Sequence, residues 1–183
     1  MLKSAVEGTL TQQWRETHKP KETCAQLLER ILIERRQSWE KKKLEEFKEK
    51  AKNPPKDWQK KYPEPIEPDT IDLPELPKGW VWASLDMLGD LVSGVTKGNK
   101  RKSEVVTREV AYLRVANVQR GYLNLSEIKT ISATENEIKK FTLESGDILF
   151  NEGGDRDKLG RGWVWYGEVE NCIHQNHVFR MRP

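Results

Sequence analysis

The chain has 183 residues and a mass of 21.3 kDa, which suits one domain or one domain with an appendage and makes two globular cores unlikely. Apolar residues make up 36% and charged residues 33%. The net charge of +3 excludes a strongly basic protein, so the overall charge does not indicate nucleic-acid binding. No apolar run approaches the ~20 residues needed to cross a bilayer and no secretory signal opens the sequence, so we expect a cytoplasmic protein that does not enter a membrane.

The two cysteines also bear on the class of protein. Cys24 and Cys172 lie far apart, in segments of different composition. This usage argues against a disulfide scaffold and against a four-cysteine zinc site, and it fits a reducing compartment.

The N-terminal part of the sequence predicts helices. Residues 2–6 place apolar side chains at helical spacing before Gly8, where a left-handed helix cap is common, so we expect the end of a helix belonging to a longer protein. A long helix is predicted from residue 21 to about residue 51, with Thr23 as its cap. Its apolar stripe consists of Leu27, Leu28, Ile31 and Leu32. Its basic residues alternate with glutamates, as on a solvated helix face, and we therefore predict a helical arm over residues 1–52.

A proline-rich segment follows the helical arm. Seven of the nine prolines fall within residues 53–77. Because proline fixes φ and lacks an N–H donor, this segment is expected to be helix-free and to form a semi-rigid, extended connector.

Residues 78–183 have the composition of a globular domain, with short β-rich runs separated by glycine and asparagine turns. Strands are predicted near 110–116, 126–131, 147–151, 162–168 and 177–182. Thr134 and Glu137 form a capping box for a helix that ends near Lys140, and Ser84 can cap another over residues 85–88. The irregular order of strands and helices indicates an α+β fold with a mixed sheet.

Two partial motifs raise the question of catalysis on DNA. Residues 53–55 (NPP) begin like the motif with which amino-methyltransferases hold a flipped base, yet Lys56 stands where the stacking aromatic is needed. Glu-x-Lys tripeptides at 127–129 and 137–139 lack an identifiable acidic partner for a nuclease metal site. P-loop and Gly-x-Ser-x-Gly motifs are absent. We therefore expect a protein that is not an enzyme and has no catalytic residues.

A possible metal site is considered in the C-terminal segment. Cys172, His174 and His177 fall within six residues. On an extended strand His177 points away from the face shared by the other two, and no fourth ligand has a recognisable spacing. A structural or hydrogen-bonding role is favoured, with neither a metal ion nor a cofactor expected.

A local concentration of charge and amides favours DNA reading. Residues 97–120 hold seven basic and two acidic residues, a local balance of +5, whereas residues 71–183 as a whole are neutral. This is the electrostatic footprint of a phosphate-binding surface, and arginine and amide side chains are the groups that contact base edges. A second polar loop at 151–162 contains four glycines. Its charges either pair within the loop or face DNA, and the spacing alone leaves both possibilities open.

The candidate DNA-binding residues follow from these two stretches and from the C-terminal segment. Phosphate neutralisation is expected mainly from Lys97, Lys100, Arg101 and Lys102. Base contacts are expected from Arg114, Asn117, Gln119 and Arg120. Further candidates are Asn99, Asn151, Arg156, Lys158, Arg161, Gln175 and Asn176. Because alternate residues of a strand point to opposite faces, we expect some of these side chains to be structural.

Four ordered segments of the chain resemble the target recognition domain of type I restriction-modification specificity subunits. They are residues 76–82 (LPKGWVW), 112–123 (YLRVANVQRGYL), 146–162 (GDILFNEGGDRDKLGRG) and 172–180 (CIHQNHVFR). At the front end, residues 2–11 resemble the end of such a subunit's central helical spacer, and residues 27–36 resemble the connector that leads to its second recognition domain.

The resemblance implies a DNA-reading subunit whose recognition domains each read one half of a bipartite target. Its helices would dock the modification (methyltransferase) and restriction subunits, which carry the chemistry in bacterial defence. Relative to that family, the chain is expected to lack the first recognition domain and most of the spacer, and to stop at residue 183 before the second domain ends. The alternative is a truncated remnant that serves only as a helical docking piece for the modification subunit, without sequence-specific DNA binding.

Overall fold

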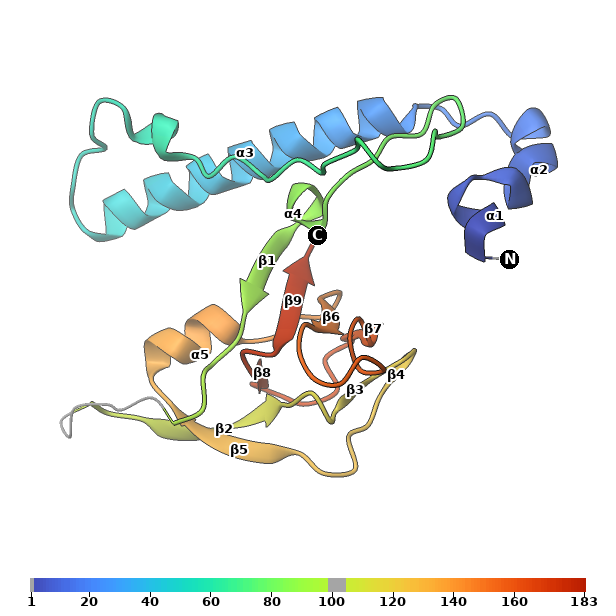
Figure 1. Cartoon of the computed structure of the whole chain (residues 1–183). Coiled ribbons are helices and arrows are strands. Elements are labelled where there is room, and N and C mark those ends of the chain that lie inside the picture. The colour runs from blue at the N-terminus through green and yellow to red at the C-terminus, as the bar shows by residue number, and fades with distance from the viewer. Residues whose placement is uncertain (1, 99–104) are drawn as a thin grey trace. The chain divides into compact units, whose positions relative to one another are not determined.

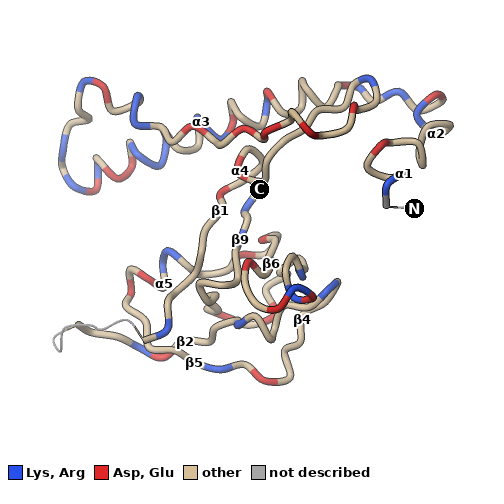
Figure 2. The backbone as a smooth tube through the Cα atoms, viewed as in Figure 1, with Lys and Arg blue, Asp and Glu red and all other residues tan. Residues whose placement is uncertain are grey.

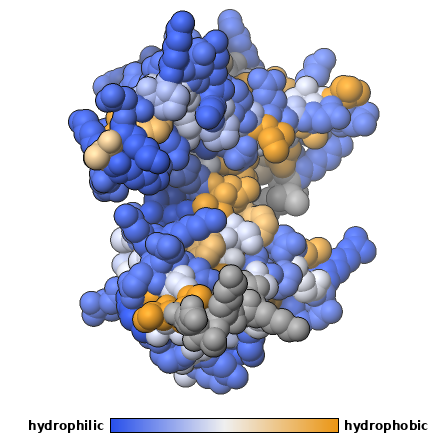
Figure 3. Space-filling view, turned by 90° about the vertical axis from the view of Figure 1, so that its left-hand side faces the viewer, coloured by the Kyte–Doolittle hydropathy of each residue, from blue (hydrophilic) through white to orange (hydrophobic). Residues whose placement is uncertain are grey.

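A computed structural model describes residues 2–98 and 105–183 of the chain (Figure 1). The chain divides into two compact units, unit 1 (Met1–Leu88) and unit 2 (Gly89–Pro183). Helices dominate unit 1 and strands dominate unit 2, so the expected α+β class is confirmed. In Figure 3, hydrophilic side chains cover most of the visible face of both units, as the high charged fraction requires.

Unit 1 is built around one long helix. Its elements in chain order are α1 (Leu2–Val6), the 3₁₀ helix η1 (Thr9–Thr11), α2 (Gln12–Thr17), α3 (Cys24–Glu49), the 3₁₀ helix η2 (Trp58–Lys61) and α4 (Leu85–Leu88). The predicted cap of α3 is confirmed as a capping box: the Thr23 hydroxyl accepts the Gln26 N–H at 3.2 Å, and the Gln26 side chain accepts the Thr23 N–H at 2.8 Å. The predicted cap of α4 is confirmed too, because Ser84 Oγ accepts the Met87 N–H at 3.2 Å.

The proline-rich segment lies inside unit 1. After α3 the chain turns at Ala51 and runs back along the helix (Figure 1). Arg36 of α3 pairs with Glu64 of the returning segment at 3.3 Å. The expectation that this segment contains no helix is wrong for one turn, since η2 forms between Pro55 and Pro63, where no proline interrupts the local hydrogen bonds.

The described residues of unit 2 form three sheets. A four-stranded antiparallel sheet has the order β1-β9-β6-β7, a three-stranded mixed sheet has the order β5-β2-β8, and β3 pairs with β4. The strands are β1 (Asp90–Ser93), β2 (Arg108–Leu113), β3 (Val118–Gln119), β4 (Tyr122–Leu123), β5 (Lys129–Ala133), β6 (Ile148–Asn151), β7 (Gly162–Val164), β8 (Ile173–His174) and β9 (Val178–Arg182). The helix α5 (Glu135–Phe141) begins at the predicted Thr134 capping box.

The core of unit 2 lies on both faces of β2. One cluster contains Leu113 with Leu149, Trp165 and Val178. The other contains Val110 and Tyr112 with Ile138 of α5 and Ile173 of β8. Successive side chains of a strand point to opposite faces, so one strand can supply both clusters. Two buried clusters, one on each face of β2, therefore hold the loops that join these strands.

Close backbone approach ties β1 to this core. A Cβ on Gly94 would overlap the carbonyl of His174, and the Val95 N–H donates to that carbonyl at 2.8 Å. A glycine is therefore needed where the chain leaves β1.

All five predicted strands overlap observed ones, with shifted bounds. The strand predicted to reach residue 116 ends at Leu113, because the Asn117 side chain accepts the Arg114 N–H at 2.9 Å and turns the chain. The strands β1, β3, β4 and β8 were not predicted. Three of these four have only two residues, too few for alternation to reveal them.

Candidate nucleic-acid interface

Three loops that are distant in sequence lie side by side in unit 2. We call residues 114–121, 152–161 and 175–177 together the polar loop surface. Gln119 Oε1 accepts a hydrogen bond from Arg161 at 2.8 Å, joining the first two loops. The Glu152 N–H donates to the His177 carbonyl at 3.1 Å, joining the second to the third. The fold therefore brings together the two candidate stretches and the C-terminal amides that the sequence analysis treated separately.

Two asparagines hold these loops from inside and are not free to read bases. Asn117 is 3% exposed, and its amide donates to the carbonyls of Asn124 at 2.9 Å and Glu127 at 3.0 Å. Asn151 is 2% exposed and donates to the Val118 carbonyl at 3.0 Å. Buried amides that donate to main-chain carbonyls stabilise a fold rather than a complex. For both residues the structure replaces the expected DNA contact with a structural role.

Two cations of the second loop pair within the loop, which is one of the two arrangements that the spacing left open. Arg161 binds Asp157 through Nη2 at 2.6 Å and also donates to the Asp157 carbonyl at 3.0 Å. Lys158 forms an ion pair with Asp155, and this hydrogen-bonded ammonium lowers the pKa of the Asp155 carboxyl. Lys158 and Arg161 are thus largely committed to shaping the loop.

Arg114 is also tied to the protein. Its Nη2 lies 3.2 Å from a carboxylate oxygen of Glu127, and the hydrogen bond from Arg114 is the main reason why the pKa of Glu127 is lowered. Arg108, a further member of the basic stretch, pairs with Glu135 at 2.6 Å. The local balance of +5 is therefore partly neutralised by neighbours that are distant in sequence.

Three candidate cations remain available. Lys97, Arg120 and Arg156 are exposed, and none of them has an ion-pair partner among the residues that the structure describes. Arg120 and Arg156 belong to the polar loop surface. Lys97 follows Val95, which bridges to Gln175. The other expected phosphate contacts and one amide lie outside the described residues: Asn99, Lys100, Arg101 and Lys102.

Three amide side chains of the candidate set lie at least partly at the surface. Gln119 donates to the Ala116 carbonyl at 2.8 Å besides accepting from Arg161. Gln175 and Asn176 are half-buried in the turn between β8 and β9, where their N–H groups donate to the Leu113 and Val95 carbonyls at 2.9 Å. Their main chain is therefore fixed, and their side chains reach the surface.

The cysteine and histidines of the C-terminal segment do not converge. Cys172 is buried, and burial raises its pKa to about 12. His174 is 0% exposed and lies with Nδ1 2.6 Å from the Val178 carbonyl, while His177 is exposed and pairs with Glu152 at 3.0 Å. Across residues 2–98 and 105–183, no group of three His, Cys, Asp or Glu side chains is arranged to hold a metal ion.

Two exposed aromatic residues beside the polar loop surface were missed by the sequence analysis. Trp163 of β7 is 40% exposed, and a Cβ on Gly121 would lie 3.9 Å from its ring. Tyr122 of β4 is 57% exposed. Alternation gave no signal for the outward tryptophan, because it would place Trp163 and Trp165 on one face, whereas β7 ends at Val164 and Trp165 is buried.

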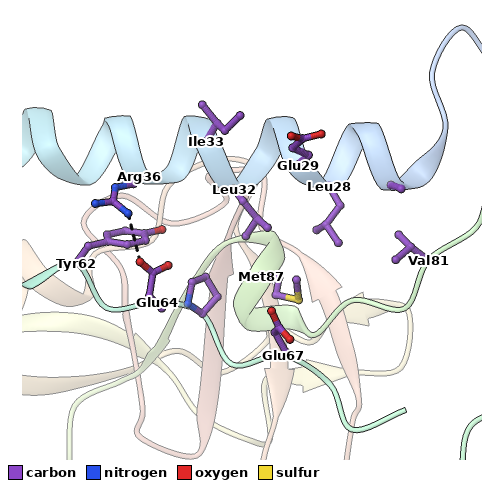
Figure 4. Close-up of a pocket in the computed structure, with 12 residues that line it drawn as sticks. Leu28, Glu29, Leu32, Ile33, Arg36, Tyr62, Glu64, Glu67, Val81 and Met87 are labelled. Carbon is purple, nitrogen blue, oxygen red and sulfur yellow. Dashed lines mark hydrogen bonds and ion pairs between the residues drawn. The ribbon is translucent and has the colours of Figure 1, made fainter. Parts of the chain in front are cut away.

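Unit 1 contributes a separate surface feature. An apolar groove of about 610 Å³ runs between α3 and the returning proline-rich segment (Figure 4). Leu28 and Leu32 of α3 face Val81 and Met87 across it, and Glu29, Pro65 and Glu67 also line it. Such a groove suits an apolar side chain or helix face of another molecule.

Compared with known proteins, the chain matches no family model and no curated protein. Among the described residues, no helix is long and apolar enough to span a membrane.

Proposed function

We propose that this chain is a non-catalytic, sequence-specific DNA-binding module of a type I restriction-modification system, in which unit 2 reads one half of a bipartite target. The observation that carries the proposal is the convergence of loops 114–121, 152–161 and 175–177 on one surface. Arg120 and Arg156 supply cations there that no described acid neutralises, and Gln175 and Asn176 supply amides. Such a module acts in the cytoplasm together with modification and restriction subunits.

The division of labour on this surface follows from its chemistry. Arginine can contact both phosphate and the guanine edge, and amides can make paired bonds to adenine. The buried Asn117 and Asn151 and the ion pairs of Asp155 and Asp157 fix the main chain of the loops. A preformed surface loses less conformational entropy on binding, which favours discrimination between sequences.

The test is selection of the intact chain against a library of random duplexes, followed by sequencing of the bound fraction. We expect enrichment of one short motif. The double variant Arg120→Gln/Arg156→Gln is expected to reduce that enrichment by at least tenfold, since each lost base contact costs roughly 1–3 kcal/mol of discrimination. The matched control is Lys139→Gln/Lys140→Gln on α5, which removes the same charge away from the polar loop surface. Recovery of random sequence by the unaltered chain would contradict the proposal.

A second candidate function is docking alone, and the groove beside α3 favours it. In this case the chain binds the modification subunit through unit 1 and is indifferent to duplex sequence. Ile33 lines the groove and is 52% exposed, so Ile33→Asp should weaken association with that subunit by at least tenfold. Leu10→Asp, at an exposed position of unit 1 outside the groove, is the control. Association without any enriched motif would favour docking over DNA reading.

A further inference from the structure

A dense group of lysines occupies one end of unit 1. Residues 41–61 hold nine lysines and four acidic residues, a net charge of +5. We call this segment the lysine end. The lysines are Lys41, Lys42, Lys43, Lys48, Lys50, Lys52, Lys56, Lys60 and Lys61. All of them belong to the part of the chain that the structure describes, and Figure 2 shows them gathered where α3 ends and the chain turns back.

An aromatic cluster fixes the two halves of the lysine end against each other. Trp58 of η2 stacks on Trp39 of α3 with ring centroids 5.8 Å apart and meets Phe47 edge-on at 6.0 Å. Tyr62 meets Trp39 edge-on at 5.4 Å. The lysines of the helix and those of the returning segment are thereby carried by one preorganised body.

Most of this positive charge is not neutralised locally. Ion pairs join Lys43 to Glu46 at 3.0 Å, Lys50 to Glu46 at 3.9 Å and Lys60 to Asp57 at 3.0 Å. Five lysines are exposed and have no ion-pair partner among the described residues: Lys41, Lys48, Lys52, Lys56 and Lys61. Placing some lysines near a helix C-terminus complements the helix dipole. That effect reaches one turn and does not account for Lys56 and Lys61, which lie beyond the helix.

The chemistry of the lysine end favours a phosphate backbone over a membrane. An amphipathic membrane anchor exposes apolar side chains beside its cations. Here the rings of Trp39, Phe47 and Trp58 pack on one another, and Leu44, at 39%, is the one large apolar side chain of described residues 41–61 that is substantially exposed. Lysine is a flexible point charge suited to phosphate, whereas reading of base edges favours arginine and amides.

We propose that the lysine end is a second DNA-contact surface, which binds phosphate groups without regard to sequence. The inference rests on the proposed function for the identity of the polyanion, duplex DNA. Each lysine that neutralises a phosphate releases a counterion, which adds affinity and makes it dependent on salt. The lysine end thus adds affinity for any duplex, and unit 2 supplies the preference among sequences.

The test measures the affinity of the intact chain for a random-sequence duplex by fluorescence anisotropy at several salt concentrations. The variant Lys52→Gln/Lys56→Gln/Lys61→Gln removes three exposed lysines without a described partner. We expect it to weaken binding at least tenfold and to reduce the slope of log K against log salt by about 2–3, because each phosphate contact contributes about 0.9 to that slope. The enrichment of the preferred motif over random sequence should stay the same.

The control Lys19→Gln/Lys21→Gln/Lys78→Gln removes the same charge from exposed positions of unit 1 outside the lysine end. It should leave the slope unchanged. An equal fall of this slope in the two variants, or no fall of the slope in the first variant, would overturn the inference. Should circular dichroism show that the first variant is misfolded, Lys41→Gln/Lys48→Gln on α3 replaces it, with an expected slope change of about 2.

Two further arms separate the sources of phosphate and the two proposals. If the lysine substitutions change the salt slope for duplex but not for a single strand of the same length, the result supports a rigid duplex backbone as the ligand. The reverse result assigns the surface to flexible single strands. Lysine-dependent binding to vesicles of anionic lipid, without binding to either nucleic acid, would overturn the inference. Loss of motif enrichment with a persistent lysine-dependent slope would refute sequence reading by unit 2 and leave the lysine end supported.

Discussion

At the scale of single residues, chemical type did not separate the amides that are buried in the fold from those that lie at the surface. Asn117 and Gln175 are both amides in polar sequence surroundings, yet Asn117 is buried with each end bonded to main chain and Gln175 reaches the surface. The difference depends on what folds over each residue. For Asn117 that is the segment 124–127, whose carbonyls accept hydrogen bonds from its amide. No local sequence pattern predicts this pairing.

The structural role of Asn117 can be tested directly. Asn117→Ala leaves the Arg114 N–H and the carbonyls of Asn124 and Glu127 without this partner. We expect the free energy of unfolding to fall by about 2–3 kcal/mol, as for an unsatisfied buried group. Urea titration followed by fluorescence measures this change. Asn176→Ala, at a half-exposed amide, should change it by less than about 0.5 kcal/mol, and equal effects would contradict the assignment.

Buried His174 makes the stability of unit 2 depend on pH. Burial lowers its pKa from 6.5 to about 4. Between these values the unfolded chain binds a proton that the folded chain does not. The contribution of neutral His174 to the free energy of unfolding is therefore present above pH 6.5. It is lost as pH falls through 4, by about 3 kcal/mol in all. Unfolding titrations at pH 7, 5.5 and 4.5 should show this loss in the free energy of unfolding. The loss should be smaller in His174→Gln and unchanged in His177→Gln. The same slope in His174→Gln would contradict this account.

At the scale of elements, signals confined to a few neighbouring residues were reliable. The caps at Thr23, Ser84 and Thr134 were predicted from spacing and are present with the expected hydrogen bonds. The turn of 3₁₀ helix at η2 was missed because prolines on either side dominated the composition, although the four residues between them are free to form it. Local chemistry therefore predicted where elements start better than how the chain continues between them.

The C-terminal end of α3 carries a strained residue that can be improved. Ala51 has φ +49, in the left-handed region that glycine adopts without a steric penalty. The Lys52 N–H donates to the Phe47 carbonyl at 2.9 Å across this turn, so the conformation is part of the helix cap. Ala51→Gly should raise the free energy of unfolding by about 0.5–1 kcal/mol, measured by thermal melting. Ala25→Gly, in the first turn of α3, is the control and should not raise it.

At the scale of the whole molecule, the two units differ in the quality of their cores. In unit 1 the buried apolar side chains among the described residues are Leu28 and Met87, whereas unit 2 contains two clusters that include the fully buried Leu113, Leu149 and Ile173. The sequence predicted this contrast through its composition. It did not predict the arrangement of the sheets, because that depends on pairings between residues about 90 positions apart, such as Asp90 with Arg182.

This contrast predicts uneven protection of main-chain amides. Hydrogen exchange followed by mass spectrometry should show slower exchange in β2 and β6 than in α3, by at least tenfold, because local opening costs more where buried apolar area is larger. The termini of α3, where helices fray, serve as a fast-exchanging reference. Protection of α3 equal to that of β6 would contradict the expected difference.

The pairing of β1 with β9 has a further consequence. Asp90 and Arg182 are partners in the register, so the first and last strands of the described unit 2 lie side by side in one sheet. A module whose first and last strands are adjacent can be grafted into a surface loop of an unrelated host without stretching either molecule. On our proposal that unit 2 reads DNA, exchange of such cassettes between hosts would alter the recognised sequence and leave the architecture of the recipient intact.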